Sequence, residues 1–213
     1  LDREILPARV HNYQPSDLDQ LVAAGEVVWQ GVESVGPNDG RIALYLADQL
    51  PLLAPPWEVS KDELPHDIVK LLDERGALFF DEMAQHLGGF PNDLLEALWQ
   101  LVWAGAMTND TLTPLRARLH NRATSTDRDR RTRHRQRFRS RRRAKLSGAE
   151  GRWSLLRTAS DAISPTQRQT ALVEQLLDRY GVVTRATLAR EHVAGGFAAI
   201  YAVLRAMEEA GRI

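Results

Sequence analysis

The sequence predicts a mainly α-helical chain with small β wings, organised as tandem winged-helix modules. The first observation is an internal repeat, because residues 69–78 and 174–183 share an amphipathic helix pattern, a glycine that ends it, and two apolar residues. The second is that both copies continue with a short helix, a glycine turn, a third amphipathic helix and the start of a strand. This order is typical of a winged helix-turn-helix, whose third helix commonly enters a DNA groove.

The two repeats predict the later helices of each module individually. Four helices are expected, at residues 81–87, 92–104, 187–192 and 198–210. Asp81 and Thr187 open the two short helices and are interpreted as their N-caps. Phe90 and Phe197 each follow paired glycines before the third helix, and this recurrence indicates a structural role for both rings.

A third copy of the module ending occurs near the start of the chain. Residues 17–29 have the pattern of a last helix, a glycine and a strand, and a turn-rich tip at 36–40 leads into a returning strand at 41–46. We therefore expect four segments. They are the C-terminal part of a module at 1–50, a Pro-rich linker at 51–63, a module at 64–160 with an Arg-rich wing insertion at about 116–147, and the truncated start of a further module at 161–213.

Composition excludes several classes of site. The chain of 213 residues has no cysteine, which excludes disulfides, thiolate zinc sites and a cysteine nucleophile and fits a reducing cytoplasm. The apolar stretches are interrupted by polar residues and are too short to span a membrane. The six histidines lack metal-ligand spacing. We expect a cytoplasmic protein with no membrane partner and no metal site.

The net charge of zero hides a strongly cationic strip. Residues 116–145 hold 13 arginines and one lysine against two aspartates, which is +12 and leaves −12 on the rest of the chain. Guanidinium groups pair with phosphate oxygens and release counterions, so we interpret the strip as a DNA contact without sequence specificity. The alternative is a solvated loop that balances the acidic remainder. The candidate DNA-binding residues of the strip are Arg128, Arg130, Arg131, Arg133, Arg135, Arg137, Arg139, Arg141, Arg142, Arg143 and Lys145.

Arg41 is a further candidate for DNA contact, whereas the five tryptophans are interpreted as structural residues. Arg41 follows the turn at the expected wing tip, where it could reach a phosphate or the minor groove, or could simply be an exposed arginine. Trp99 and Trp103 lie four residues apart on one helix face and are interpreted as core residues. The other three tryptophans are also interpreted as structural rather than as base-stacking residues.

Several segments of the sequence resemble one known family. Motifs at residues 6–10, 13–19, 25–29, 36–41, 43–46, 79–82, 98–105 and 151–156 carry the resemblance. They include Leu-Pro-Ala-Arg-Val, Gly-Glu-Val-Val-Trp, Gly-Pro-Asn-Asp-Gly-Arg and Gly-Arg-Trp-Ser-Leu-Leu. These segments are similar to the region that follows the helicase core in bacterial Lhr (large helicase-related) proteins, and the likeness covers nearly the whole chain.

This resemblance implies a function for the parent protein. Lhr proteins are superfamily two ATP-dependent helicases that move 3′ to 5′ on single-stranded DNA and are tied to repair. Their C-terminal winged-helix region resembles AlkZ-type DNA glycosylases, and a uracil-removing activity is attributed to it. ATP and Mg are thus implied for the parent. No cofactor is expected in this fragment, because it lacks a Gly-Lys-Ser/Thr phosphate loop.

The sequence identifies no catalytic residue in the fragment. Asp81-Glu82-Met83-Ala84 is only superficially similar to a helicase Asp-Glu box. The AlkZ-type pattern of Gln, one apolar residue, then Gln or Asp has no match, because Gln167-Arg168-Gln169 has the wrong central residue. We expect a fragment that holds or guides single-stranded or forked DNA, with the rest of the helicase chain as partner. The alternatives are part of a glycosylase scaffold, a winged-helix transcription regulator, or a platform for homo-oligomers.

Overall fold

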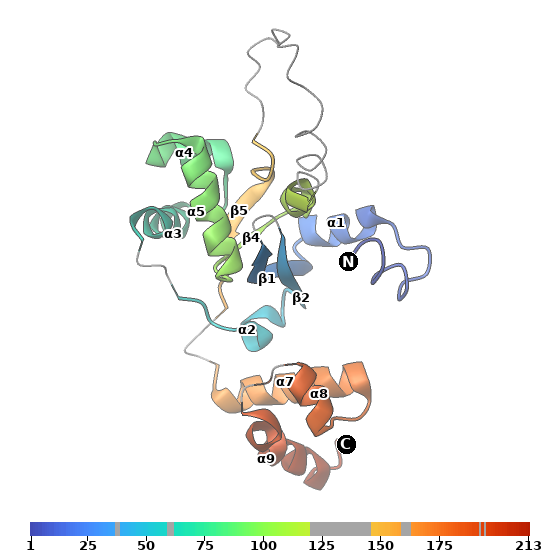
Figure 1. Cartoon of the computed structure of the whole chain (residues 1–213). Helices are drawn as coiled ribbons and strands as arrows, with labels where there is room; N and C mark the ends of the chain where they lie inside the picture. The colour runs from blue at the N-terminus through green and yellow to red at the C-terminus, as the bar shows by residue number, and fades with distance from the viewer. Residues whose placement is uncertain (37–38, 59–61, 120–145, 159–162, 192, 194) are drawn as a thin grey trace. The chain divides into compact units, whose positions relative to one another are not determined.

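The computed structural model describes the chain except for residues 37–38, 59–61, 120–145, 159–162, 192 and 194. The described residues form two compact units. The first unit contains residues 1–47 and 57–156, and the second contains residues 48–56 and 157–213 (Figure 1).

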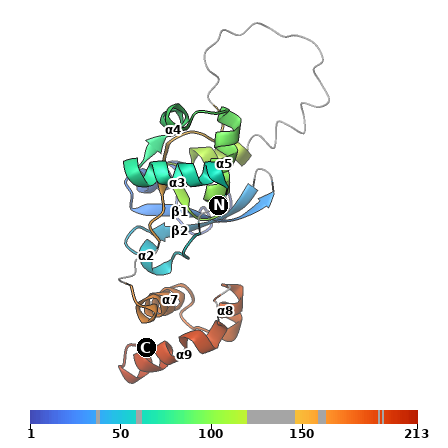
Figure 2. The ribbon, with the colours of Figure 1, turned by 90° about the vertical axis from the view of Figure 1, so that its left-hand side faces the viewer.

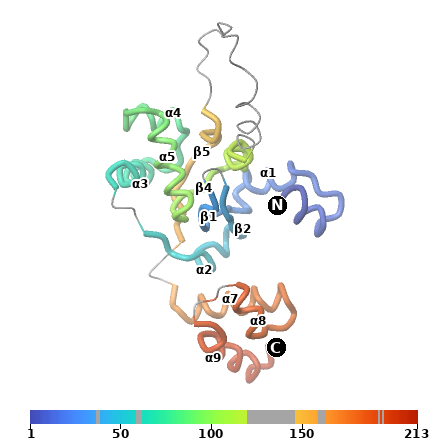
Figure 3. The backbone as a smooth tube through the Cα atoms, in the orientation of Figure 1, coloured from blue at the N-terminus to red at the C-terminus, as the bar shows by residue number. Residues whose placement is uncertain are grey.

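The first unit begins with a helix and a β-hairpin. After a turn-rich N-terminal segment, helix α1 (Pro15–Ala23) is followed by strands β1 (Val27–Gly36) and β2 (Asp39–Leu46), as the chain trace in Figure 3 shows. Gly25 has φ +75° and lets the chain leave the helix for β1. The strands are antiparallel, with Val27 opposite Leu46, so the hairpin expected around residues 36–46 is confirmed.

The rest of the first unit is a winged helix. Its elements are α3 (Glu63–Arg75), β3 (Leu78–Phe79), α4 (Phe80–Leu87), α5 (Pro91–Trp103), β4 (Met107–Asn109) and β5 (Arg152–Leu155). Strand β5 lies between β3 and β4 and is antiparallel to both, and α3, α4 and α5 contact the strands of this sheet. Figure 2 shows these three helices packed together. Strand β5 is therefore the return strand of the module's wing. The predicted fold class, mainly α with small β wings, is confirmed.

The short helices begin earlier than the sequence predicts. Phe79 is the N-cap of α4, and its backbone N–H donates to the Glu82 carboxylate at 2.8 Å. Thr184 is the N-cap of α8 (Arg185–Arg190), and its hydroxyl accepts from the backbone N–H of Thr187 at 3.2 Å. Asp81 and Thr187 are thus inside the first turn, because the backbone N–H of each N-cap donates to the side chain of the third helical residue and so fixes the start of the helix.

One hydrophobic core joins two of the expected segments. Trp29 of β1 is completely buried and belongs to the same core as Leu98 of α5 and Trp153 of β5. Its ring meets that of Trp153 edge to face, with 6.5 Å between centroids. Residues 1–47 therefore do not form a compact unit of their own, although the sequence pattern separates them from residues 64–160.

The second unit is a three-helix module with a short additional helix. Helices α7 (Pro165–Tyr180), α8 and α9 (Gly196–Glu209) surround a small core that includes Val173, Leu176, Leu188 and Ile200. Helix α2 (Leu50–Leu53), which lies partly in the expected Pro-rich linker, packs against α7. Within the described residues, no helix combines the length and apolar character needed to cross a membrane.

Candidate nucleic-acid interface

The cationic strip belongs to the connection between β4 and β5, which is the wing of this winged helix. Residues 113–119 at its start are helical, and residues 146–151 lead back into β5. The strip candidates from Arg128 to Lys145 lie outside the described residues.

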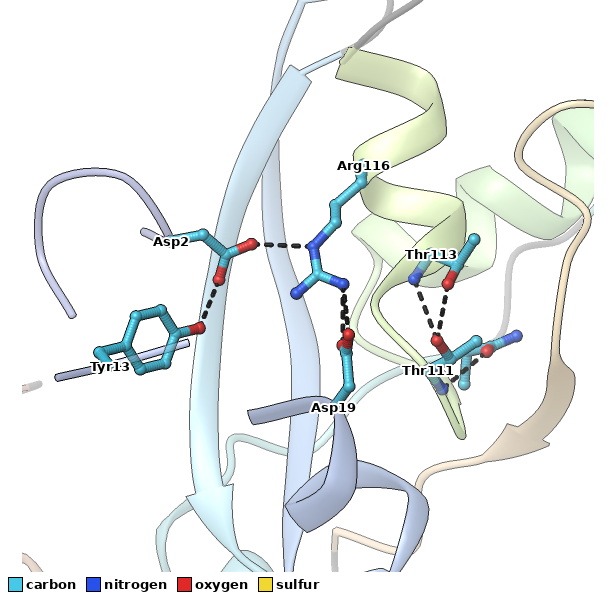
Figure 4. Close-up of polar contacts among 7 residues, drawn as sticks. Asp2, Tyr13, Asp19, Thr111, Thr113 and Arg116 are labelled. Atoms are coloured by element: carbon cyan, nitrogen blue, oxygen red, sulfur yellow. Dashed lines mark hydrogen bonds and ion pairs between the residues drawn. The ribbon is translucent and has the colours of Figure 1, made fainter. Parts of the chain in front are cut away.

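Arg116, at the start of the strip, forms hydrogen bonds within the first unit. Its Nε donates to Asp2 at 2.8 Å, and its Nη1 donates to both carboxylate oxygens of Asp19 at 2.8 Å (Figure 4). The Tyr13 hydroxyl donates to the other oxygen of Asp2. These bonds fasten the N-terminal segment and α1 to the beginning of the wing.

The contacts in this cluster shift the pKa values of Asp2 and Tyr13. Burial raises the pKa of the Asp2 carboxyl, but the hydrogen bonds from Arg116 and Tyr13 outweigh burial and hold that pKa below its ordinary value of 3.8. Burial and the hydrogen bond to Asp2 raise the pKa of Tyr13 to about 12. The cluster is therefore built to keep Asp2 ionised and Tyr13 neutral.

Arg118 is also a structural arginine. Its guanidinium lies 4.6 Å from the centroid of the Trp99 ring, and burial lowers the pKa of its side chain. The Trp99 indole N–H donates to the carbonyl oxygen of Gly148 at 3.0 Å. Arg116 and Arg118 are the two arginines of the strip that the structure describes. Both thus stabilise the first residues of the connection between β4 and β5. Sequence reasoning missed this role, because their partners are remote in sequence.

Arg41 is an exposed residue of the hairpin. Its side chain is 67% exposed and its guanidinium forms a 2.8 Å ion pair with Glu33 on the opposite strand. A phosphate at this position would compete with Glu33 for the same guanidinium. The DNA-binding role of Arg41 therefore stays a prediction.

The third helix of the first unit has an outward face without cations. The exposed polar residues of α5 are Asn92, Asp93, Glu96 and Gln100, and its sequence contains no lysine or arginine. Strand β1 packs against the end of α5 at Gly31. An acidic helix face repels phosphate, so this copy does not offer the usual groove-binding helix.

The third helix of the second unit has a different surface. Tyr201 and Arg205 of α9 are exposed, and the Tyr201 ring lies 5.8 Å from that of Phe197. The Arg205 guanidinium forms an ion pair with Glu209 one turn later. The two repeats therefore share their elements but not their surface charge.

The aromatic residues follow the sequence interpretation with one exception. Trp29, Trp99 and Trp153 are buried, and the Trp57 indole N–H donates to the Leu156 carbonyl oxygen at 2.7 Å, so their structural role is confirmed. Phe90 is the exception, because it is 77% exposed. The structural role expected for Phe90 from its repetition is wrong, since the turn directs its ring into solvent.

No metal centre was expected from the histidine spacing. Within the described part of the chain, no three histidine or carboxylate side chains are grouped so that they could hold a metal ion.

Comparison with known proteins identifies the modules. Two family models, each described as "Large helicase-related protein, winged-helix domain", match residues 1–47 and 162–213. The chain is 38% identical over 218 residues to a Mycolicibacterium smegmatis protein named "Lhr helicase/ probable uracil glycosylase". It is 36% identical over 229 residues to the Escherichia coli "Lhr helicase/uracil glycosylase".

The chain belongs to the winged-helix region of the Lhr family. The matches cover 98% and 100% of this chain but only 14% and 15% of the two Lhr relatives. The resemblance found in the sequence motifs is thereby confirmed. The match to residues 1–47 covers the hairpin whose Trp29 completes the core of the adjacent Lhr winged helix.

Proposed function

We propose that this chain is a DNA-binding part of an Lhr-type helicase, and that it holds or guides single-stranded or forked DNA without reading its sequence. The observation that carries this proposal is a +12 strip inserted between β4 and β5 of a winged helix, in a chain that is similar over 98% and 100% of its length to two Lhr helicases. A wing is one of the two surfaces with which such modules reach DNA, and arginine is the side chain best suited to phosphate.

The charge distribution supports contact through the wing rather than through α5. The chain outside the strip carries −12, and the exposed face of α5 holds Asp93 and Glu96. A polyanion is therefore attracted to the strip and repelled by the helix face. Contacts confined to phosphates position a strand but do not specify its bases.

The activity of the whole protein is a wider proposal. An Lhr-type parent would use ATP and Mg²⁺, bound by a helicase core outside these residues, to move 3′ to 5′ on DNA during repair in the cytoplasm. Both relatives carry uracil glycosylase in their names, and the proposed parent would share that activity. The role of this chain in either reaction is to hold the strand.

The proposal is tested by DNA affinity as a function of salt. The chain of residues 1–213 should bind labelled single-stranded and forked DNA, with an affinity that falls steeply between about 50 and about 200 mM salt. Replacing Arg128, Arg130, Arg131 and Arg133 by glutamine should lower the slope of log affinity against log salt. The slope should fall by about 0.7 for each phosphate of the single strand that the variant no longer neutralises.

The matched control removes the same charge elsewhere. The variant with Arg3, Arg9, Lys70 and Arg75 replaced by glutamine has the same net charge as the strip variant, and all four side chains are exposed in the first unit. Its slope of log affinity against log salt should equal that of the unmodified chain. Equally reduced slopes in the two variants, or binding that ignores salt, would contradict the proposal.

A second candidate function is a platform that assembles protein rather than DNA. The acidic α5 face and the packing of β1 against α5 favour it, because both remove this helix from DNA contact. Light scattering distinguishes the two functions, since a stable oligomer with no DNA affinity supports the platform. Excision of uracil by residues 1–213 alone would instead support a catalytic role for the fragment.

A further inference from the structure

A cavity of about 560 Å³ opens in the first unit beside the start of α4. Phe79, Asp81 and Gln85 line it on one side, and Leu146 and Glu150, from the residues that lead into β5, line it on the other. Its volume is within the range of small-molecule sites, which is about 300 to 1,000 Å³. The cavity is therefore large enough for one nucleotide.

The aromatic wall of this cavity is accessible and has a cation beside it. Phe79 is 50% exposed, because side chains alternate along a strand and Leu78 takes the inward position of β3. Arg152, which lies next to the cavity rather than in its lining, is directly opposite Phe79 in the antiparallel ladder. Its guanidinium lies over the ring, 5.6 Å from the centroid, and its Nη2 donates to the Ala77 carbonyl oxygen at 3.3 Å. An exposed ring with an adjacent arginine is the combination that proteins use for a base and its phosphate.

The polar wall offers free hydrogen-bonding groups. Asp81 and Gln85 are four residues apart on α4 and therefore lie on the same face of the helix. Among the described residues, neither side chain has a hydrogen-bond or ion-pair partner. Glu150 differs from them, because its Oε2 accepts from the backbone N–H of Gly148 at 2.8 Å. The Asp81 carboxylate and the Gln85 amide are thus available to a ligand.

We propose that this cavity receives one unpaired base of single-stranded DNA. The base stacks on Phe79, its edge bonds to Asp81 and Gln85, and the adjoining phosphate pairs with Arg152. A carboxylate accepts the exocyclic amino group of adenine, cytosine or guanine, whereas thymine offers only its N3–H, which is flanked by two carbonyl oxygens that repel the carboxylate. The cavity therefore holds the strand and prefers amino-bearing bases. This inference rests on the proposed DNA-binding function and names a second point of attachment for the strand.

The experiment uses residues 1–213 and an oligodeoxyadenylate of about twelve nucleotides that carries one 2-aminopurine. The unmodified chain should raise the 2-aminopurine fluorescence, because a base that stacks on Phe79 leaves the adenine stack that quenches it in the free oligonucleotide. Phe79→Leu should weaken binding about tenfold and abolish the fluorescence increase, whereas the affinity of Phe79→Tyr, which keeps the ring, should remain within about twofold of the unmodified chain. Asp81→Asn should reduce the preference for oligodeoxyadenylate over oligothymidylate, and Arg152→Gln should weaken binding to both.

Phe90→Leu is the matched control, because it removes a more exposed phenylalanine that does not line the cavity. This variant should bind the oligonucleotide and raise the fluorescence as the unmodified chain does. Circular dichroism checks that each variant is folded. If Phe79→Leu binds and raises the fluorescence as the unmodified chain does, while the strip variant binds DNA more weakly, this inference alone is overturned. If the unmodified chain of residues 1–213 does not bind DNA, both this inference and the proposed function are overturned.

Discussion

The Trp29 indole N–H donates a 3.0 Å hydrogen bond to the backbone carbonyl oxygen of Asn109. In return, the Thr108 hydroxyl donates to the carbonyl oxygen of Trp29 at 2.7 Å. These bonds join β1 to β4 although the two strands belong to different sheets. The β1–β2 hairpin, which the sequence pattern assigns to one Lhr module, therefore packs into the core of the next module.

Replacing Trp29 by phenylalanine should destabilise the whole first unit. The ring remains apolar, but the Asn109 carbonyl oxygen loses its indole donor in a buried position, which costs about 1 to 3 kcal/mol in free energy of unfolding. Urea unfolding followed by circular dichroism measures the change. Leu46→Ala, at an exposed position of the same hairpin, should change stability by less than about 0.5 kcal/mol. Equal stability of the parent and the Trp29 variant would show that the hairpin does not support the winged helix.

Gly31→Ala should disrupt the packing of β1 on α5. A Cβ at this position would lie 2.1 Å from the Val102 carbonyl oxygen, so the backbone of one element must move. Overpacking of this kind costs about 1 to 3 kcal/mol, and it should appear as a lower thermal midpoint in calorimetry. Gly36→Ala in the same strand is the control, since a Cβ there would meet nothing within 4 Å. A thermal midpoint that falls equally in both variants would assign the effect to strand propensity instead of packing.

Acid should weaken the junction around Asp2. Because the folded-state pKa of this carboxyl lies below 3.8, it contributes stability above its unfolded-state pKa, and this stability is lost as the pH falls through the folded-state value. The difference in unfolding free energy between about pH 6 and about pH 3 should be smaller in Asp2→Asn than in the parent. Glu4→Gln, at an exposed neighbouring carboxylate, should leave the difference unchanged.

Arg116→Gln tests the same junction from the cationic side. It removes hydrogen bonds to two carboxylates that are only partly exposed, which should cost about 1 to 3 kcal/mol at neutral pH. Urea unfolding measures the change, and amide exchange of α1 should become faster. Unchanged stability would mean that the N-terminal segment is held by its apolar packing alone.

Ser164→Ala should destabilise the second unit through α7. The Ser164 hydroxyl accepts from the backbone N–H of Gln167 at 3.2 Å, and the Gln167 side chain accepts from the backbone N–H of Ser164 at 2.8 Å. Loss of this capping box should cost about 1 kcal/mol, whereas Ser164→Gly should cost only a few tenths. Amide exchange in α7 and α9 reports the second unit separately from the first. Similar protection in the alanine and glycine variants would contradict the capping role.

Local patterns in the sequence were sufficient to predict most of the helices and strands. Helical spacing of apolar residues, glycines that end helices and strand alternation predicted the third helices and the hairpin, because these signals act over a few neighbouring residues. The N-caps of α4 and α8 were misplaced, since Glu82 and Thr187 decide them through bonds to Phe79 and Thr184. The exposure of Phe90 was also missed, because repetition does not report which way a turn directs a ring.

The sequence by itself determined the winged-helix elements, the cationic strip and the membership in the Lhr family. Only the tertiary structure decided that residues 1–47 share a core with residues 57–156, and that Arg116 and Arg118 are structural rather than free cations. The cavity beside Phe79 likewise combines α4 with residues near β5. The physical reason is sequence distance, because a periodic pattern records which face of an element is buried but not which remote side chain covers it.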